Sequence, residues 1–119
     1  ALISNIDDHP RNHALLAKNA DWRLSPAYDL TPAVPVSLDR RDLAMECGDA
    51  GRFANAHNLL SQSARFLLDA AQAAAMLDAM EEQVRGTWYV TARSVGVSER
   101  DCERIASAFA YPGFRQNRT

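Results

Sequence analysis

One polar stretch near the start of the chain decides how the rest is organised: Asn5-Ile6-Asp7-Asp8-His9-Pro10-Arg11-Asn12-His13. Six of its nine residues are Asp, Asn or His, and Pro10 interrupts any helix that would run through them. Such a segment is poor material for a hydrophobic core. It is therefore either an ordinary polar loop or a loop that carries chemistry. A lone acid, Asp29, inside the otherwise apolar stretch 26–30 favours chemistry.

The spacing of three oxygen-bearing side chains predicts a site for phosphoryl transfer. Asp7 and Asn12 are five residues apart, and Asp29 follows seventeen residues after Asn12. In the catalytic loop of protein kinases, H-R-D-x-x-x-x-N, the base Asp and the metal-binding Asn are also five apart, and a second metal-binding Asp comes later. We interpret Asp7 as a catalytic base, and Asn12 and Asp29 as Mg²⁺ ligands, since Mg²⁺ prefers hard oxygen donors.

Each of these three residues, taken alone, also fits a structural role. Asp7 would then cap a turn, and the Asn12 amide would tie down backbone groups of the loop. Asp29 would be a helix cap or turn residue before Thr31-Pro32. The combination and its spacing favour the catalytic interpretation.

The loop and a second motif, Trp22-Arg23-Leu24-Ser25-Pro26-Ala27-Tyr28-Asp29-Leu30, together resemble the C-terminal part of HipA-family serine/threonine kinases. Those kinases are the toxins of bacterial toxin–antitoxin pairs. The resemblance is tight over the two motifs and looser through 43–45 and the helical remainder. It implies ATP and Mg²⁺ as cofactors and a protein Ser or Thr as acceptor. It also implies a small DNA-binding antitoxin of the HipB type as partner, so that any contact with DNA is indirect.

Two further loop residues are candidates for a supporting role. The family resemblance places a histidine two residues after the base, where His9 stands in this chain. His9 would support the base or touch the phosphate, and a purely structural role in the loop is an equal alternative. Arg11 is a candidate phosphate contact, against the alternative of a solvated surface position.

The same loop admits a weaker alternative, a transition-metal site of the zinc or iron hydrolase type. His9 and His13 are four residues apart, and two histidines at this spacing on a helix can share one metal. Pro10 argues against a continuous helix, and the apolar residues after His13 favour a strand.

Length and composition indicate a single domain, residues 1–119, with one modest core. The formal charge of −2 does not provide the excess of basic residues that is typical of nucleic-acid binding. No apolar run approaches the roughly 18–20 residues of a membrane span. Cys47 and Cys102 stand alone, 55 residues apart, which favours reduced thiols in a cytoplasmic protein.

A kinase also needs a segment that cradles the nucleotide, and the sequence contains no Gly-rich phosphate loop. Lys18, the only lysine, follows the catalytic-type loop instead of preceding it on a strand. The chain starts without Met and reaches that loop at once. We therefore expect a fragment of a C-terminal lobe that is inactive alone; a non-catalytic helical interaction module is the alternative. A fragment should expose apolar surface, and self-association is one way to hide it.

Hydrophobic periodicity predicts a mainly α fold with a few short strands. Two strands are expected around a turn at 18–21, from residues 13–17 and 22–24, and a third at 43–47, after a loop at 31–41. Helices are expected at 57–68, at about 70–94, and from 98 to about 111. Residues 1–30 would then hold the catalytic and metal loops, and residues 54–112 the helical part.

The longest predicted helix has the clearest boundaries. Asp69 is expected to cap its start, with Gln72 in the reciprocal capping-box place, and Gly96 to end it. Its apolar face is predicted to consist of Ala73, Met76, Leu77, Met80, Val84, Trp88 and Ala92. Its solvent-facing side is predicted to include Asp78, Glu81, Glu82 and Arg85. The tail from Phe114 onward is expected to fray.

Overall fold

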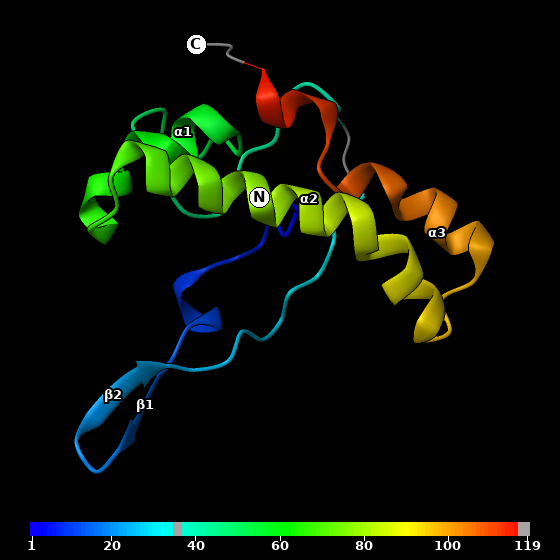
Figure 1. Cartoon of the computed structure of the whole chain (residues 1–119). Helices are drawn as coiled ribbons and strands as arrows, with labels where there is room; N and C mark the ends of the chain where they lie inside the picture. Colours follow the sequence, from blue (N-terminus) through cyan, green and yellow to red (C-terminus); the bar gives the residue numbers. More distant parts are fainter. Residues whose placement is uncertain (35–36, 117–119) are drawn as a thin grey trace.

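A computed structural model describes residues 1–34 and 37–116 and is mainly helical, with one two-stranded sheet in the described part (Figure 1). The N-terminal segment contains the 3₁₀ turn η1 (Pro10–Asn12) and the strands β1 (Leu15–Lys18) and β2 (Asp21–Leu24). The later helical elements are α1 (Ala56–Ser61), η2 (Ser63–Phe66), α2 (Ala70–Ser94), α3 (Glu99–Ile105), η3 (Ala106–Ala108) and η4 (Pro112–Arg115). The predicted fold class is confirmed.

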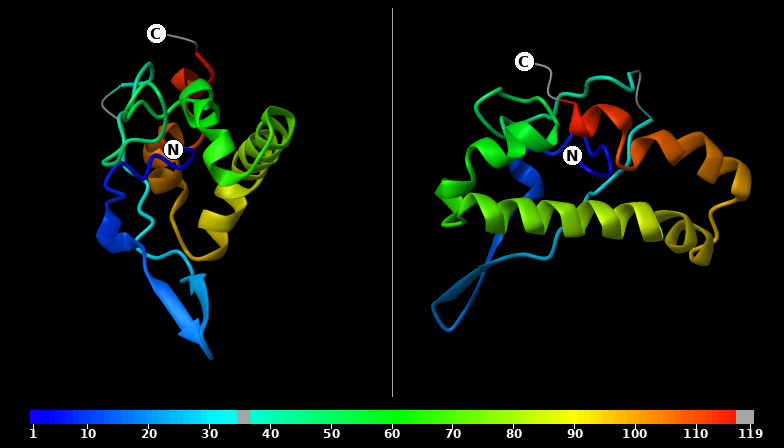
Figure 2. Two further views of the ribbon diagram at one scale, coloured as in Figure 1. Left: turned by 90° about the vertical axis from the view of Figure 1, so that its left-hand side faces the viewer. Right: turned by 45° about the horizontal axis from the view of Figure 1, so that its top comes forward.

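The hairpin of β1 and β2 projects away from the helices (Figure 2). The strands are antiparallel, with Leu15 opposite Leu24 and Lys18 opposite Asp21. The two turn residues Asn19 and Ala20 both have positive φ, 52° and 65°, as a tight two-residue hairpin turn requires. The predicted hairpin is therefore confirmed, although its first strand begins at Leu15, later than expected, and its turn is shorter than 18–21 because Lys18 and Asp21 pair within the strands.

Helix α2 begins and ends where the sequence predicts. The carboxylate of Asp69 accepts a hydrogen bond from the backbone N–H of Gln72 at 2.8 Å, and the Gln72 side chain accepts one from the N–H of Asp69 at 3.1 Å. Gly96, at φ 91°, donates its N–H to the carbonyl of Arg93 just past the last helical residue. Across the described part of the chain, no helix, α2 included, combines the length and apolar character that crossing a membrane requires.

The hydrophobic core is small and lies where the two ends of the described chain meet α1. Tyr111 and Phe114 are fully buried beside Ala56, and Leu2 and Leu77 pack against them. The prediction that the tail frays from Phe114 is wrong up to residue 116, because Phe114 is 0% exposed. The rest of that prediction falls on 117–119, outside the described residues.

The third predicted strand, at 43–47, does not form. Residues 42–53 instead fold back on themselves through two isolated bridges, Asp42 with Phe53 and Gly48 with Gly51. The buried side chain of Asn58 adds to these bridges: its Nδ2 donates to the carbonyls of Gly51 and Phe53 at 2.9 and 2.8 Å. The backbone groups of this loop are thus satisfied partly by one another, as in the hydrogen bond from Leu43 N–H to the Arg52 carbonyl at 2.8 Å, and partly by a side chain, a combination that no periodicity reveals.

Two predicted helices are shorter than expected. Helix α1 ends at Ser61, and Leu67, in the left-handed conformation after η2, is 93% exposed, not packed on an apolar face. Helix α3 ends at Ile105 and leaves Ala106 exposed, so the chain turns well before Pro112. Pro112 does not stop a helix; it starts η4, where its fixed φ suits the first position.

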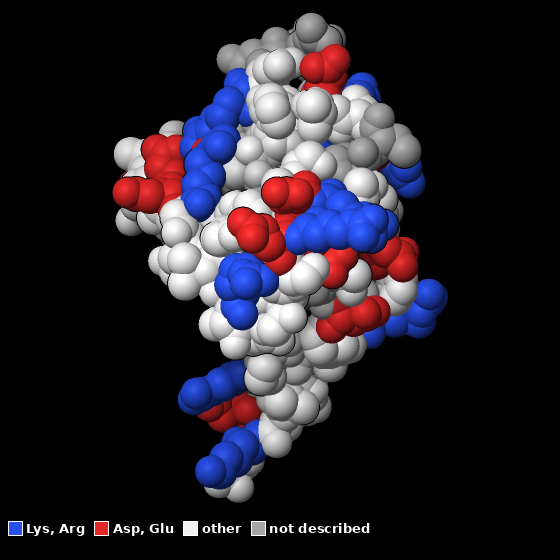
Figure 3. All heavy atoms as spheres, turned by 90° about the vertical axis from the view of Figure 1, so that its right-hand side faces the viewer, with Lys and Arg blue, Asp and Glu red and all other residues white. Residues whose placement is uncertain are grey.

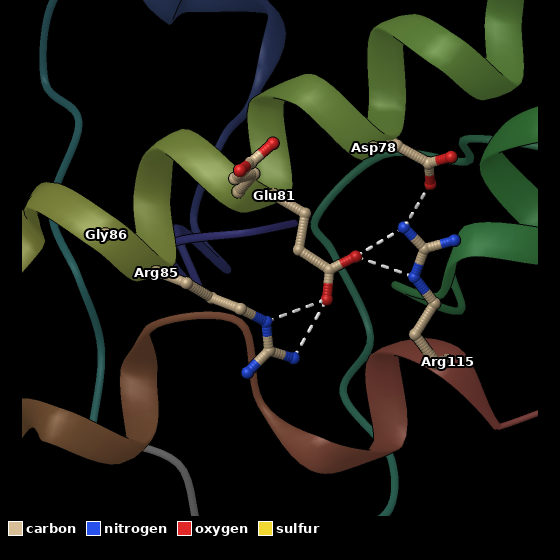
Figure 4. Close-up of a pocket in the computed structure, with 6 residues that line it drawn as sticks. Asp78, Glu81, Arg85, Gly86 and Arg115 are labelled. Atoms are coloured by element: carbon tan, nitrogen blue, oxygen red, sulfur yellow. Dashed lines mark hydrogen bonds and ion pairs between the residues drawn. The ribbon is translucent and has the colours of Figure 1, made fainter.

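The predicted faces of α2 are partly wrong. Met76 and Met80, assigned to the apolar face, are about half exposed. Glu81, assigned to solvent, is 7% exposed and forms the centre of an ion-pair cluster (Figure 4). Its carboxylate accepts hydrogen bonds from Arg85 at 2.8 Å and from Nε of Arg115 at 2.6 Å. Arg115 belongs to η4, so the cluster ties α2 to the end of the described chain.

Candidate functional site

The polar loop is held by short-range hydrogen bonds that set the position of Asn12. Pro10 occupies the first position of η1, and the N–H of Asn12 donates to the carbonyl of His9 at 2.9 Å. Asn12 is buried, and its Nδ2 lies 3.5 Å from the backbone carbonyl of Asp7. No hydrogen bond from a described residue engages Asn12 Oδ1, the atom that would bind a metal.

The hairpin returns the chain to this loop, and two long-range hydrogen bonds hold the returning segment. The hydroxyl of Tyr28 donates to the carbonyl of Arg11 at 2.7 Å. The N–H of Ala33 donates to the carbonyl of Ser4 at 3.1 Å. Asp29 lies between these two ties in the sequence, so its position relative to the loop is fixed on both sides.

Asp7 and Asp29 line the same cavity, of about 240 Å³, together with Asn5, Ile6 and Thr31. Neither carboxylate accepts a hydrogen bond from any residue in the described ranges. The Asp29 carboxylate is a hard-oxygen donor of the kind that Mg²⁺ binds in proteins, and the carboxylate of Asp7, the predicted base, lines the same cavity. Asn12 does not line this cavity, although it lies beside Asp7. The structure therefore brings two of the three predicted residues together directly.

The backbone at Asp29 is unusual. Its φ is 56°, in the left-handed region that few residues other than glycine adopt. Asp and Asn tolerate this region better than other non-glycine residues, because their short polar side chains interact with the local backbone. A residue held in such a conformation is often found at a functional site.

The other loop residues have distinct surroundings. His9 is half buried, and its Nδ1 is buried without a hydrogen-bond partner among the described residues. Arg11 has an exposed side chain, and its backbone carbonyl accepts the hydrogen bond from the Tyr28 hydroxyl. His13 is exposed, and its Nε2 lies 2.9 Å from the carboxylate of Asp8.

The transition-metal alternative receives no support from the described residues. They contain no cluster of three or more His, Cys, Asp or Glu side chains placed to hold a metal ion. Residues 10–12 form a single 3₁₀ turn, so His9 and His13 do not lie on one α-helix.

Sequence reasoning missed the residues that assemble the site. The sequence alone assigns no role to Tyr28, and Ser4 and Ala33 contribute only backbone atoms. An aromatic hydroxyl directly before an isolated acid is the one signal that pointed to Tyr28. A hydrogen bond between backbone atoms, such as that from the Ala33 N–H to the Ser4 carbonyl, cannot be recognised from the sequence.

Charged side chains are mixed over the visible face in Figure 3, where Lys and Arg lie beside Asp and Glu. This face carries no broad patch of one sign. The mixture accords with the formal net charge of −2.

The fold and the cavity define a mainly α domain with a projecting hairpin, in which a polar loop and a returning acid share one cavity. Residues 1–88, which include the loop, the hairpin and Asp29, match the HipA-like C-terminal domain family, and the chain belongs to that family. The chain matches no curated protein and no solved structure.

Proposed function

We propose that this chain supplies the catalytic base and the Mg²⁺ ligands of a HipA-like serine/threonine kinase. The observation that supports the proposal best is the shared cavity of Asp7 and Asp29, in which both carboxylates are unengaged by the described residues. Membership of the HipA-like C-terminal domain family adds support.

Asp7 would orient the acceptor hydroxyl of a protein Ser or Thr and accept its proton as the phosphoryl group is transferred. Asp29 would hold Mg²⁺, with the Asn12 amide oxygen as the second protein ligand. Mg²⁺ would neutralise the charge of the ATP phosphates. His9, in the same loop, would contact a phosphate or support the base; its buried Nδ1 has no partner among the described residues. Arg11 is the second candidate phosphate contact.

A complete kinase site also requires groups that cradle the nucleotide, and these would come from another part of the protein. Lys18 lies on the exposed strand β1, after the loop, and is poorly placed to pair with the phosphates. We therefore expect the isolated chain to be inactive. By analogy with the family, the protein would act in the cytoplasm as a toxin paired with a small DNA-binding antitoxin.

Calorimetric titration of Mg²⁺–ATP into this chain and into the full product of its gene tests the proposal. The Asp29→Asn variant removes the carboxylate but keeps a residue that tolerates the left-handed backbone, whereas Ala at this position would add strain. Glu82→Gln, an exposed position on α2, is the matched control.

We expect the full product to bind Mg²⁺–ATP, Asp29→Asn to weaken binding at least tenfold, about 1.4 kcal/mol, and Glu82→Gln to change nothing. A full product that does not bind Mg²⁺–ATP would overturn the proposal. The non-catalytic module would then be the better interpretation.

A further inference from the structure

A second cavity, of about 320 Å³, lies beside the first. Ile6 and Ala33 line both cavities, so the two are neighbours. The charged residues in the wall of the second cavity are Arg40, Arg41 and Asp42. Two guanidinium groups against one carboxylate give this wall a net charge of +1, whereas Asp7 and Asp29 make the first cavity negative.

The positive charge of Arg41 is built into the fold. Arg41 is 5% exposed, and its guanidinium donates to the hydroxyl of Ser4 and to the carbonyls of Ser37 at 3.3 Å and Ser107 at 2.7 Å. The guanidinium also lies 3.9 Å from the ring centroid of Tyr111. All of these partners are uncharged. Burial lowers the pKa of Arg41, but arginine remains protonated in proteins. The guanidinium therefore keeps its positive charge, and none of these partners carries a compensating negative charge.

Arg40 adds a second positive charge, and its ion pair with Asp42 can be replaced by a pair with another carboxylate. Its Nη2 lies 3.1 Å from the carboxylate of Asp42, and most of the Arg40 side chain is exposed. Exposed ion pairs contribute only about 0–1 kcal/mol. A carboxylate from another molecule can therefore compete with Asp42 for the Arg40 guanidinium, whose fork matches a carboxylate.

We propose that the second cavity binds an acidic side chain of the protein substrate that lies a few residues from the acceptor Ser or Thr. The inference rests on the proposed function, which places the acceptor hydroxyl beside Asp7. A peptide that reaches Asp7 would pass Ile6 and Ala33 and meet the wall of Arg40 and Arg41. Complementary charge on the peptide would fix its register and exclude basic sequences.

Fluorescence anisotropy with two labelled peptides tests this inference without ATP or Mg²⁺. Both peptides contain one Ser among neutral residues; one carries Glu three positions to either side of it, and the other carries Lys there. The variant Arg40→Glu reverses the charge of the wall. Arg23→Glu is the matched control, because Arg23 is also exposed and also pairs with an Asp two residues away.

At low ionic strength we expect the chain to bind the Glu peptide about fivefold to tenfold more tightly than the Lys peptide, the scale of one or two surface ion pairs. Arg40→Glu should abolish or reverse this preference, and Arg23→Glu should keep it. Equal binding of the two peptides, or an unchanged preference in Arg40→Glu, would overturn the inference. Since the titration contains no nucleotide, that failure is distinguishable from failure to bind Mg²⁺–ATP.

Discussion

At the scale of the residue, Asp29 combines a left-handed backbone with a carboxylate that no described residue engages. A conformation of this kind costs about 1 kcal/mol or more in a non-glycine residue, less for Asp and Asn. A glycine at this position would relieve the strain, so Asp29 is not the residue that backbone conformation alone would favour.

The strain at Asp29 is open to a direct test. We expect Asp29→Gly to leave the free energy of unfolding unchanged or to raise it by up to about 1 kcal/mol, because glycine adopts positive φ freely. Asp29→Ala should lower it by about 1 kcal/mol. Urea denaturation of the three proteins gives both values. Equal stability of the Gly and Ala variants would show that the backbone at this position is not strained.

Glu81 shows how an acidic residue can contribute to the stability of the fold. Burial by itself would raise the pKa of the Glu81 carboxyl, but hydrogen bonds from Arg115 and Arg85, and their positive charges, outweigh it and hold the pKa below its ordinary value of 4.5. The folded protein therefore binds this proton less readily than the unfolded chain. The stabilisation is fully present above about pH 4.5 and is lost as the pH falls through the lower folded value.

We expect Glu81→Gln to lower the free energy of unfolding at pH 7 by about 1–2 kcal/mol, because two arginines lose a charged acceptor. The variant should also lose less stability than the parent when the pH falls from 7 to 3. Thermal denaturation at a series of pH values measures both effects. Glu82→Gln, one residue along α2 but exposed, is the control; an equal loss in that variant would contradict the role of the cluster.

At the scale of the element, the hairpin has an apolar face without cover. Opposite residues in a ladder share a face, and faces alternate along each strand, so Leu15, Ala17, Trp22 and Leu24 lie on one side. Leu15, Trp22 and Leu24 are 61%, 65% and 73% exposed. The opposite side carries the charged residues Lys18, Asp21 and Arg23 together with Leu16. An isolated two-stranded hairpin is marginally stable in water, so this face is the best candidate for contact with another part of the protein or with a partner.

Replacing Trp22 and Leu24 together by Thr should change the free energy of unfolding by less than about 0.5 kcal/mol, because both side chains are largely exposed. The same change should reduce self-association of the isolated chain in sedimentation velocity. The association should be weak, since four side chains supply much less than the roughly 800 Å² per partner of a specific interface. Val90→Thr, at an exposed apolar residue of α2, should leave it unchanged; an equal reduction would exclude the hairpin face as its cause.

The sequence predicted those elements whose signals are local. The Asp69 cap and Gly96 fixed both ends of α2, and alternation around a short turn located the hairpin. The loop at 42–53 could not be predicted, because it depends on Asn58, a buried amide from a helix that follows it. Gly48 is needed there for close approach, since a Cβ would lie 1.9 Å from the Asn58 carbonyl oxygen, but glycine is also common in ordinary turns.

At the scale of the whole molecule, the spacing of Asp7 and Asp29 predicted that they would be neighbours, and they line one cavity. The spacing did not predict what connects that region to the helices. Arg41 and Ser4 bond to residues 107 and 108, more than sixty positions away. Hydrogen bonds between residues so far apart in the sequence form only in the complete fold. Their acceptors are backbone carbonyls, which every residue has, so the sequence does not indicate which residue accepts.

The hairpin that carries the uncovered face also carries Lys18, the only lysine of the chain. Lys18 is exposed on β1, beside the turn. An amine-reactive reagent therefore has a single side-chain target in the molecule, and that target lies on the projecting element. The extent of its modification, read by mass spectrometry, would report whether anything covers the charged side of the hairpin, opposite the apolar face, in purified protein and in a crude extract alike.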